Sequence, residues 1–166
     1  MSHRLSSRHV LVSALLAGSL LAALVPSMAG AATPKTGYYA GSTSQMIQST
    51  DPAAAPEAGS VDFKVRKNGS SATARKLFHV GATTQLTCPS GEVKQDYFSV
   101  YIMLGGKIDR YGRFKYSYRG FNFKGRFTSK TSAKGTLSRT LGDCTTGSVT
   151  WTAKKSIERG LPIPTL

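Results

Sequence analysis

Acidic residues and histidines are scarce in this chain. Its 166 residues include 8 Asp+Glu and 3 His, against 22 Lys+Arg. General acid–base catalysis and metal binding need such side chains in close groups. The sequence has no His/Cys/Asp/Glu cluster at metal-ligand spacing and no glycine-rich phosphate loop. We therefore predict no metal site, no cofactor and no catalytic residue, and we expect a protein that is not an enzyme.

Two hydrolytic arrangements lack support for the same reason. His79 is the one histidine beyond position 31, and no acid lies near it in the sequence. We expect it on the opposite strand face from Phe78 and Val80, so a Ser-His-Asp arrangement is not predicted. Asp62 and Asp96 stand at the starts of predicted strands with nothing to pair them, so no carboxylate pair for glycoside hydrolysis is predicted. A hydrolase remains only a minor alternative.

Long apolar runs are absent except near the N-terminus. The run from Val10 to Val25 follows Arg4 and Arg8 and precedes Ala29-Gly30-Ala31. A basic start, an apolar stretch and a small-x-small site are typical of a secretory signal peptide. The run of about 16 residues is short for a membrane-spanning helix. We predict cleavage after Ala31, a secreted protein and no membrane span after cleavage.

The chain has only two cysteines, Cys88 and Cys144. An even cysteine count in an exported protein indicates a disulfide, whereas a redox or metal site would favour C-x-x-C spacing, which is absent. The predicted bond closes a long loop and stabilises the domain by about 4 kcal/mol in the chain-entropy model.

Positive charge dominates what is present. Loss of Arg4 and Arg8 with the signal peptide lowers the formal net charge of +14 by two. Such a charge attracts polyanions, with a strength that salt screens. Outside a cell we expect an anionic envelope polymer or polysaccharide as the partner and no specific nucleic acid. The alternative is that the positive charge only keeps the protein soluble and binds no particular partner. The sequence does not indicate the oligomeric state.

Short alternating segments predict an all-β fold. After a lead at 32–35, we expect one β domain at 36–156 with a Pro/Ala-rich loop at 44–60, then a tail at 157–166. Turn signals every eight to twelve residues favour an antiparallel sandwich or an up-and-down barrel of about 8–9 strands. A closed barrel requires the last strand to pair with the first, which the sequence leaves undecided. The expected strands are 36–43, 61–66, 74–80, 83–88, 96–104, 113–119, 121–127, 132–139 and 149–153.

The alternation also assigns side chains to the two faces of these strands. The outward positions form a candidate anion-binding surface: Lys64, Arg66, Lys115, Lys124, Arg126, Lys134 and Lys154. The inward positions form a candidate apolar interior: Phe98, Phe114, Tyr116, Phe121, Phe123 and Trp151. These aromatic residues either fill a core or line the cavity of a barrel that carries a small apolar ligand.

One predicted strand and one predicted loop stand apart. The strand at 96–104 is apolar on both faces, so we expect the loop at 44–60 to cover it; an exposed aromatic patch is the alternative. A protease inhibitor that displays this loop also remains open.

Short motifs occur along most of the chain beyond Ala31. They are Gly37-Tyr38-Tyr39-Ala-Gly41-Ser-Thr43, Val61-x-Phe63-x-Val65, Cys88-x-x-Gly91, Gly125-Arg126-Phe127, Ala133-x-Gly135-Thr136-Leu137 and Cys144-x-x-Gly147-x-Val149-x-Trp151-x-Ala153-Lys154. Together they resemble a group of small exported β-rich proteins of high-GC Gram-positive bacteria. The group has no established activity, so the resemblance implies a fold and a compartment but no site.

Overall fold

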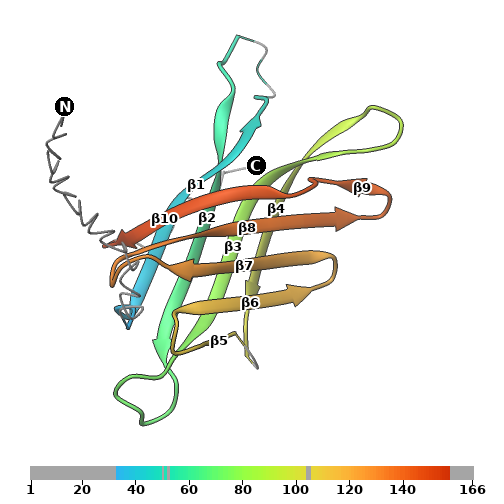
Figure 1. Cartoon of the computed structure of the whole chain (residues 1–166). Coiled ribbons are helices and arrows are strands. Elements are labelled where there is room, and N and C mark those ends of the chain that lie inside the picture. Colours follow the sequence, from blue (N-terminus) through green and yellow to red (C-terminus); the bar gives the residue numbers. More distant parts are fainter. Residues whose placement is uncertain (1–32, 50, 52, 104–105, 158–166) are drawn as a thin grey trace, which may run out of the picture.

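The computed structural model describes residues 33–49, 51, 53–103 and 106–157. The predicted signal peptide and nearly all of the predicted tail lie outside these residues. All regular elements in the described ranges are β-strands, and each pairs antiparallel to its neighbours (Figure 1). The strands are β1 (Gly37–Ile47), β2 (Glu57–Lys67), β3 (Arg75–Thr87), β4 (Val93–Tyr101), β5 (Lys107–Ile108), β6 (Arg113–Tyr118), β7 (Phe121–Phe127), β8 (Ser132–Leu141), β9 (Cys144–Thr145) and β10 (Val149–Ser156). No helix suited to crossing a bilayer occurs in the described ranges.

The sheet closes into a six-stranded barrel. The ring runs β10-β1-β2-β3-β9-β8 and returns to β10, with β7 and β6 extending from β8 and β4 and β5 pairing with β3. The decisive pairing joins the last strand to the first, in register from Tyr38 with Ser156 to Thr43 with Trp151. The all-β prediction is confirmed, and the structure is a barrel and not a sandwich.

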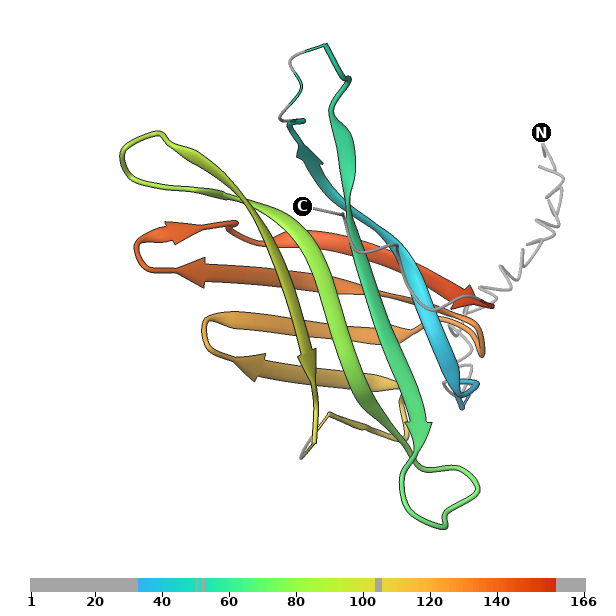
Figure 2. The same ribbon diagram turned by 180° about the vertical axis from the view of Figure 1, so that it is seen from behind.

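The barrel consists of two halves that cross each other. The first half is β1–β5 and the second half is β6–β10, and Figure 2 shows the strands of one half running across those of the other. Phe63 of β2 lies at the centre, where its ring contacts Phe123 and Trp151 of the second half at centroid distances of 5.8 and 5.7 Å. Aromatic burial of this kind supplies most of the packing energy of a small core.

One disulfide bond and two hydrogen-bonded contacts also connect the halves. The predicted disulfide is present and joins Cys88, next to the end of β3, to Cys144 of β9. The guanidinium of Arg139 on β8 donates to Asp96 of β4 at 3.0 Å, in a pair whose side chains are 11% and 15% exposed. The hydroxyl of the buried Tyr39 on β1 lies 2.8 Å from the backbone carbonyl of Lys35 and 3.0 Å from that of Lys130, in the β7–β8 turn, and its one proton is shared between these two acceptors.

The bounds of two predicted segments need correction. The segments expected at 74–80 and 83–88 form one long strand, β3, because the pairing with β2 and β4 continues through Gly81 and Ala82. The loop expected at 44–60 is shorter, since β1 reaches Ile47 and β2 begins at Glu57. Paired side-chain and backbone hydrogen bonds between Gln45 and Gln85 hold this extension of β1 against β3.

The loop between β1 and β2 does not cover β4. Tyr97 and Tyr101 of β4 are 48% and 65% exposed, and Met103 just beyond it is 78% exposed. Phe98, on the other face of β4, stacks on Phe121 at 4.1 Å. The strand is apolar on both faces, but only its inner face is buried in the described structure.

Candidate anion-binding face

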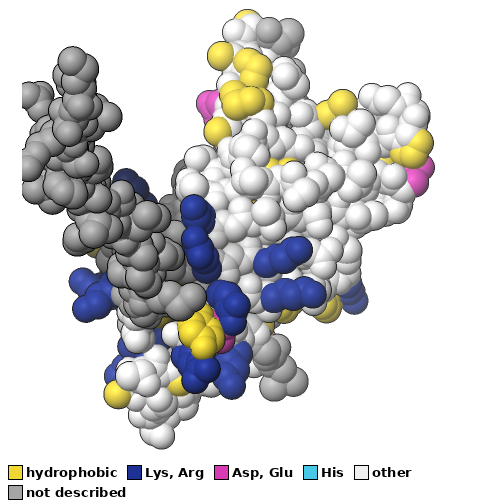
Figure 3. Space-filling view, in the orientation of Figure 1, with side chains coloured by type: hydrophobic (Ala, Val, Ile, Leu, Met, Phe, Trp, Pro, Cys, Tyr) yellow, Lys and Arg dark blue, Asp and Glu magenta, His cyan; other side chains and the backbone are white. Residues whose placement is uncertain are grey.

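The strands of the second half carry charge of one sign. Every charged residue within β6, β7, β8 and β10 is Lys or Arg, and β9 has no charged residue. Strand alternation directs most of these side chains to the outside, because the inner positions belong to the core. Figure 3 shows dark blue side chains spread over the visible face of these strands.

The strand register arranges the outward side chains in two rows. One row crosses the four strands as Lys115, Lys124, Thr136 and Thr150, which are successive cross-strand partners. The second row is Arg113, Arg126, Lys134 and Thr152, again in register. Partners in a row are about 5 Å apart, and rows two residues apart along a strand are separated by about 7 Å. Two basic rows thus flank one path across the sheet.

A shallow hollow of about 650 Å³ lies between the rows. Its floor is the row Phe114, Gly125, Gly135 and Trp151, whose side chains, where present, point inward. Both glycines are required by close approach: a Cβ at either position would overlap the indole of Trp151 and the backbone of the neighbouring strand. The glycines therefore let the indole of Trp151 pack directly under the sheet, and the outer side of this row carries no side chain because its residues point inward.

Most of the basic side chains here have no counter-charge. Among the described residues, Lys115, Lys124, Arg126 and Lys134 are exposed and have no ion-pair partner. Paired cations attract a further anion less strongly, so unpaired ones contribute more to binding a polyanion.

Arg113 at the end of its row differs, because it pairs with Asp109 at 2.9 Å. Desolvation would raise the pKa of the Asp109 carboxyl, but hydrogen bonds from the backbone and guanidinium of Arg113 and from the backbone of Tyr111 together hold that pKa below its ordinary value. The carboxylate therefore offsets part of the charge at this end.

The other three predicted surface residues divide between two places. Lys154 is exposed on β10 and shares a second shallow hollow of about 330 Å³ with Lys134, next to the first. Lys64 and Arg66 lie on β2, outside both hollows: the Lys64 ammonium donates to the Tyr38 hydroxyl at 2.9 Å, and the Arg66 guanidinium stacks over Phe78 at 3.5 Å. Five of the seven residues thus belong to one face, and two belong to the first half.

The candidate apolar interior is a packed core. Phe114, Phe121, Phe123 and Trp151 are buried, and Phe98 and Tyr116 pack against them half-buried. Rings of neighbouring strands are in contact, as in the stack of Phe123 on Trp151 at 4.7 Å. This packing favours the core interpretation over a ligand cavity.

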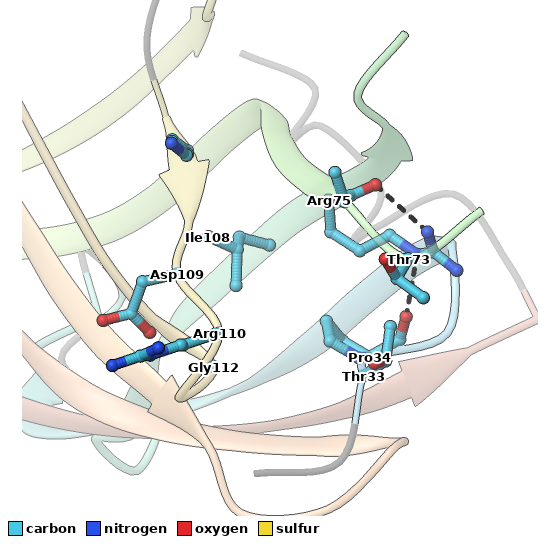
Figure 4. Close-up of a pocket in the computed structure, with 10 residues that line it drawn as sticks. Thr33, Pro34, Thr73, Arg75, Ile108, Asp109, Arg110 and Gly112 are labelled. Atoms are coloured by element: carbon cyan, nitrogen blue, oxygen red, sulfur yellow. Dashed lines mark hydrogen bonds between the residues drawn. The ribbon is translucent and has the colours of Figure 1, made fainter. Parts of the chain in front are cut away.

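A further hollow of about 490 Å³ lies near the start of β3 and β5 (Figure 4). Arg75 lines this hollow, but its guanidinium already donates hydrogen bonds to three backbone carbonyls. The acceptors are Pro34 at 3.1 Å, Ala72 at 2.8 Å and Ala74 at 3.1 Å. These bonds attach the lead segment to β3, so we interpret Arg75 as a structural residue.

One group of potential metal ligands occurs in the described ranges, Cys88, Cys144 and Asp143. Its two sulfur atoms form the disulfide, and a disulfide lacks the thiolates that bind metals.

Sequence reasoning missed one arrangement in the first half. His79 has a carboxylate neighbour after all, since its Nδ1 lies 3.3 Å from Oδ2 of Asp62. Its Nε2 lies 2.9 Å from the Ser99 hydroxyl. A bulge between β2 and β3 also places Phe78 on the same side as His79, where both rings contact Tyr101. Nothing in the spacing of these residues signals the contact, because three separate strands supply them.

No family model, no curated protein and no solved structure matches this chain. The resemblance to exported β-rich proteins therefore stays a prediction, and the function has to be argued from the surface itself.

Proposed function

We propose that this chain is a secreted protein that binds an anionic polymer of the cell envelope through the outer face of β6–β8 and β10. The observation that supports this most directly is the pair of basic rows on strands without a single acid. Binding by this face needs no enzymatic step. The attraction is between Lys or Arg side chains and repeated phosphate or carboxylate groups.

The spacing of the rows fits an extended polymer better than a compact anion. A single charged group contacts one or two side chains, whereas a chain along the hollow meets Lys115 and Lys124 on one side and Arg126 and Lys134 on the other. The threonine hydroxyls at the β10 end provide uncharged hydrogen-bonding partners for the same chain.

The test is the salt dependence of binding to a linear polyphosphate and to an acidic polysaccharide. Neutralising four charges on a flexible polymer predicts a slope of log affinity against log salt of about −3. A quadruple variant, in which Lys115, Lys124, Arg126 and Lys134 are each replaced by Gln, should bind the polymer about tenfold or more weakly at 0.1 M salt.

A matched control removes the same charge from the other half. Replacing Lys67, Lys76, Lys94 and Lys107 by Gln gives an identical change in net charge, and we expect a much smaller loss. Equal losses in the two variants would mean that net charge alone drives binding. Retention on the polymer at high salt would exclude charge attraction as the mechanism.

A further inference from the structure

We propose that Ser99, His79 and Asp62 form a nucleophilic site on the outer face of the first half that cleaves carboxylic esters. The Ser99 hydroxyl lies 2.9 Å from Nε2 of His79, and Nδ1 of His79 lies 3.3 Å from Oδ2 of Asp62. A nucleophile, a base in contact with it and a carboxylate that orients the base are the three parts that such chemistry needs. This inference is independent of the polymer-binding proposal.

The register of β2, β3 and β4 explains how these residues meet. Asp62, Gly81 and Ser99 are successive cross-strand partners, and His79 lies two residues from Gly81 on the same face. A Cβ at Gly81 would overlap the carboxylate of Asp62. The missing side chain therefore lets Asp62 lean over β3 toward His79.

The imidazole of His79 lies between the carboxylate of Asp62 and the ring of Tyr101. Nδ1 is buried and has no aligned hydrogen bond within the described residues, and the Asp62 carboxylate faces it. The Tyr101 ring packs against the imidazole at 5.0 Å. A proton on Nδ1 would lie beside this carboxylate, 3.3 Å from Oδ2, and that tautomer leaves the Nε2 lone pair to accept the proton of Ser99. Asp62 is thus a positioning residue, while Ser99 and His79 touch the reacting atoms.

The reaction follows from these contacts. Ser99 Oγ attacks the ester carbonyl carbon while Nε2 of His79 takes the hydroxyl proton. The tetrahedral intermediate breaks its bond to the alcohol oxygen, which leaves with that proton, and an acyl-serine remains. Water then attacks the acyl carbon and passes a proton to Nε2. Collapse releases the carboxylic acid and returns the proton to Ser99.

A backbone donor for the developing oxyanion lies next to the nucleophile. The backbone N–H of Ile102 donates to Phe78 of β3 at 2.8 Å, and donors alternate in direction along a strand. The N–H of Ser99 therefore points away from β3, toward an edge of β4 that pairs with no other strand in the described structure. A polar donor in this position stabilises charge on the former carbonyl oxygen.

The surroundings indicate the class of ester. Ser99 is exposed on an open sheet face, which suits an acyl group that stands out from a larger molecule. Lys64 is the cross-strand partner of His79, and Arg66 stacks over Phe78 beside it. Two cations flanking the site favour an ester on an anionic carrier.

The experiment uses the chain from position 32 onward with its disulfide intact. A fluorophosphonate probe should label Ser99, identified by peptide mass, and p-nitrophenyl acetate should be hydrolysed. Ser99→Ala should abolish labelling, and His79→Gln should slow acylation by about 100-fold or more. Asp62→Asn should slow the labelling rate constant and ester hydrolysis per folded molecule, whereas a partial loss of folding would lower the fraction of protein that is labelled and leave the rate constant of the folded fraction unchanged.

Ser117→Ala is the matched control, because Ser117 is also an exposed strand serine but contacts Asn122 in place of a histidine. It should label and hydrolyse like the parent. Far-UV circular dichroism establishes that each variant is folded. Absence of label on the parent protein, or hydrolysis by Ser99→Ala at the parental rate, would overturn the assignment.

Discussion

The two halves of the barrel share one architecture but treat charge in opposite ways. In the first half, two acids on the strands have charged or titratable partners: Asp62 lies beside His79, and Asp96 pairs with Arg139 across the barrel. In the second half, strands without acids present Lys124, Arg126 and Lys134 unpaired to the outside. The comparison teaches that a net positive charge is not evenly spread. One half has the unbalanced charge, and the other has the specific polar contacts.

Glycines mark the centre of each face, with different physical constraints. Gly135 faces the interior, where a Cβ would meet Trp151 and the backbone of β7. Gly81 faces the outside, where a Cβ would meet the movable carboxylate of Asp62. An added Cβ would therefore contact rigid core atoms at Gly135 and a side chain that can move at Gly81.

The largest effect should come from separating the halves at the disulfide. Replacing Cys88 and Cys144 together by Ser should lower the free energy of unfolding by about 4 kcal/mol, because the unfolded chain regains the entropy of a long loop. Urea unfolding of oxidised and variant protein measures this. A loss below about 1 kcal/mol would mean that the other ties suffice to join the halves.

The buried charge pair between the halves should come next. Asp96→Asn leaves the largely buried guanidinium of Arg139 without its counter-charge, and should cost about 3 kcal/mol. Asp109→Asn breaks an exposed pair with Arg113 and should cost less than about 1 kcal/mol. Urea midpoints of the two variants check the contrast, and similar costs would contradict it.

The two central glycines give a direct comparison of the faces. Gly135→Ala should cost about 3 kcal/mol, because neither the backbone of β7 nor the packed indole can move far. Gly81→Ala should cost about 1 kcal/mol, since Asp62 can swing aside. Thermal unfolding distinguishes them, and a larger loss at Gly81 would contradict the flexible-neighbour argument. On the further inference above, Gly81→Ala should also reduce ester cleavage.

The smallest change in stability should come from removing the hydroxyl of Tyr39, which lies between the backbone carbonyls of Lys35 and Lys130. Burial raises the pKa of its hydroxyl to about 12, against the pull of Arg75 and a hydrogen bond to Lys35. The folded state then holds this proton more tightly than the unfolded chain, so stability should fall as pH rises from about 10 toward 12. Tyr39→Phe should cost about 1 kcal/mol near pH 8 and weaken this alkaline loss.

Urea unfolding at pH 8 and pH 11 tests the Tyr39 prediction. Burial, followed by the nearby Tyr118, also raises the pKa of Tyr116, so part of the alkaline loss should remain in the variant. Thr152→Ala, which removes an exposed hydroxyl that does not titrate in this range, is the control and should keep the parental pH dependence. An unchanged alkaline loss in Tyr39→Phe would mean that this hydroxyl ionises as easily in the folded protein as in the unfolded chain.

The sequence by itself determined the local features of this protein. Period-two alternation placed Lys124 and Arg126 outside and Phe123 inside, because each strand residue points opposite to its neighbours. With two cysteines, only one intramolecular pairing was available, and the structure contains it. Local composition and side-chain size are enough for such assignments.

Only the tertiary structure decided which strands are neighbours. The pairing of β10 with β1 closed the barrel, and the register between β7 and β8 aligned Arg126 with Lys134 in one row. The meeting of Asp62, His79 and Ser99 likewise depends on two strand pairings and the gap at Gly81. Alternation within one strand has no information about the register of the next, and register is what brings distant residues into contact.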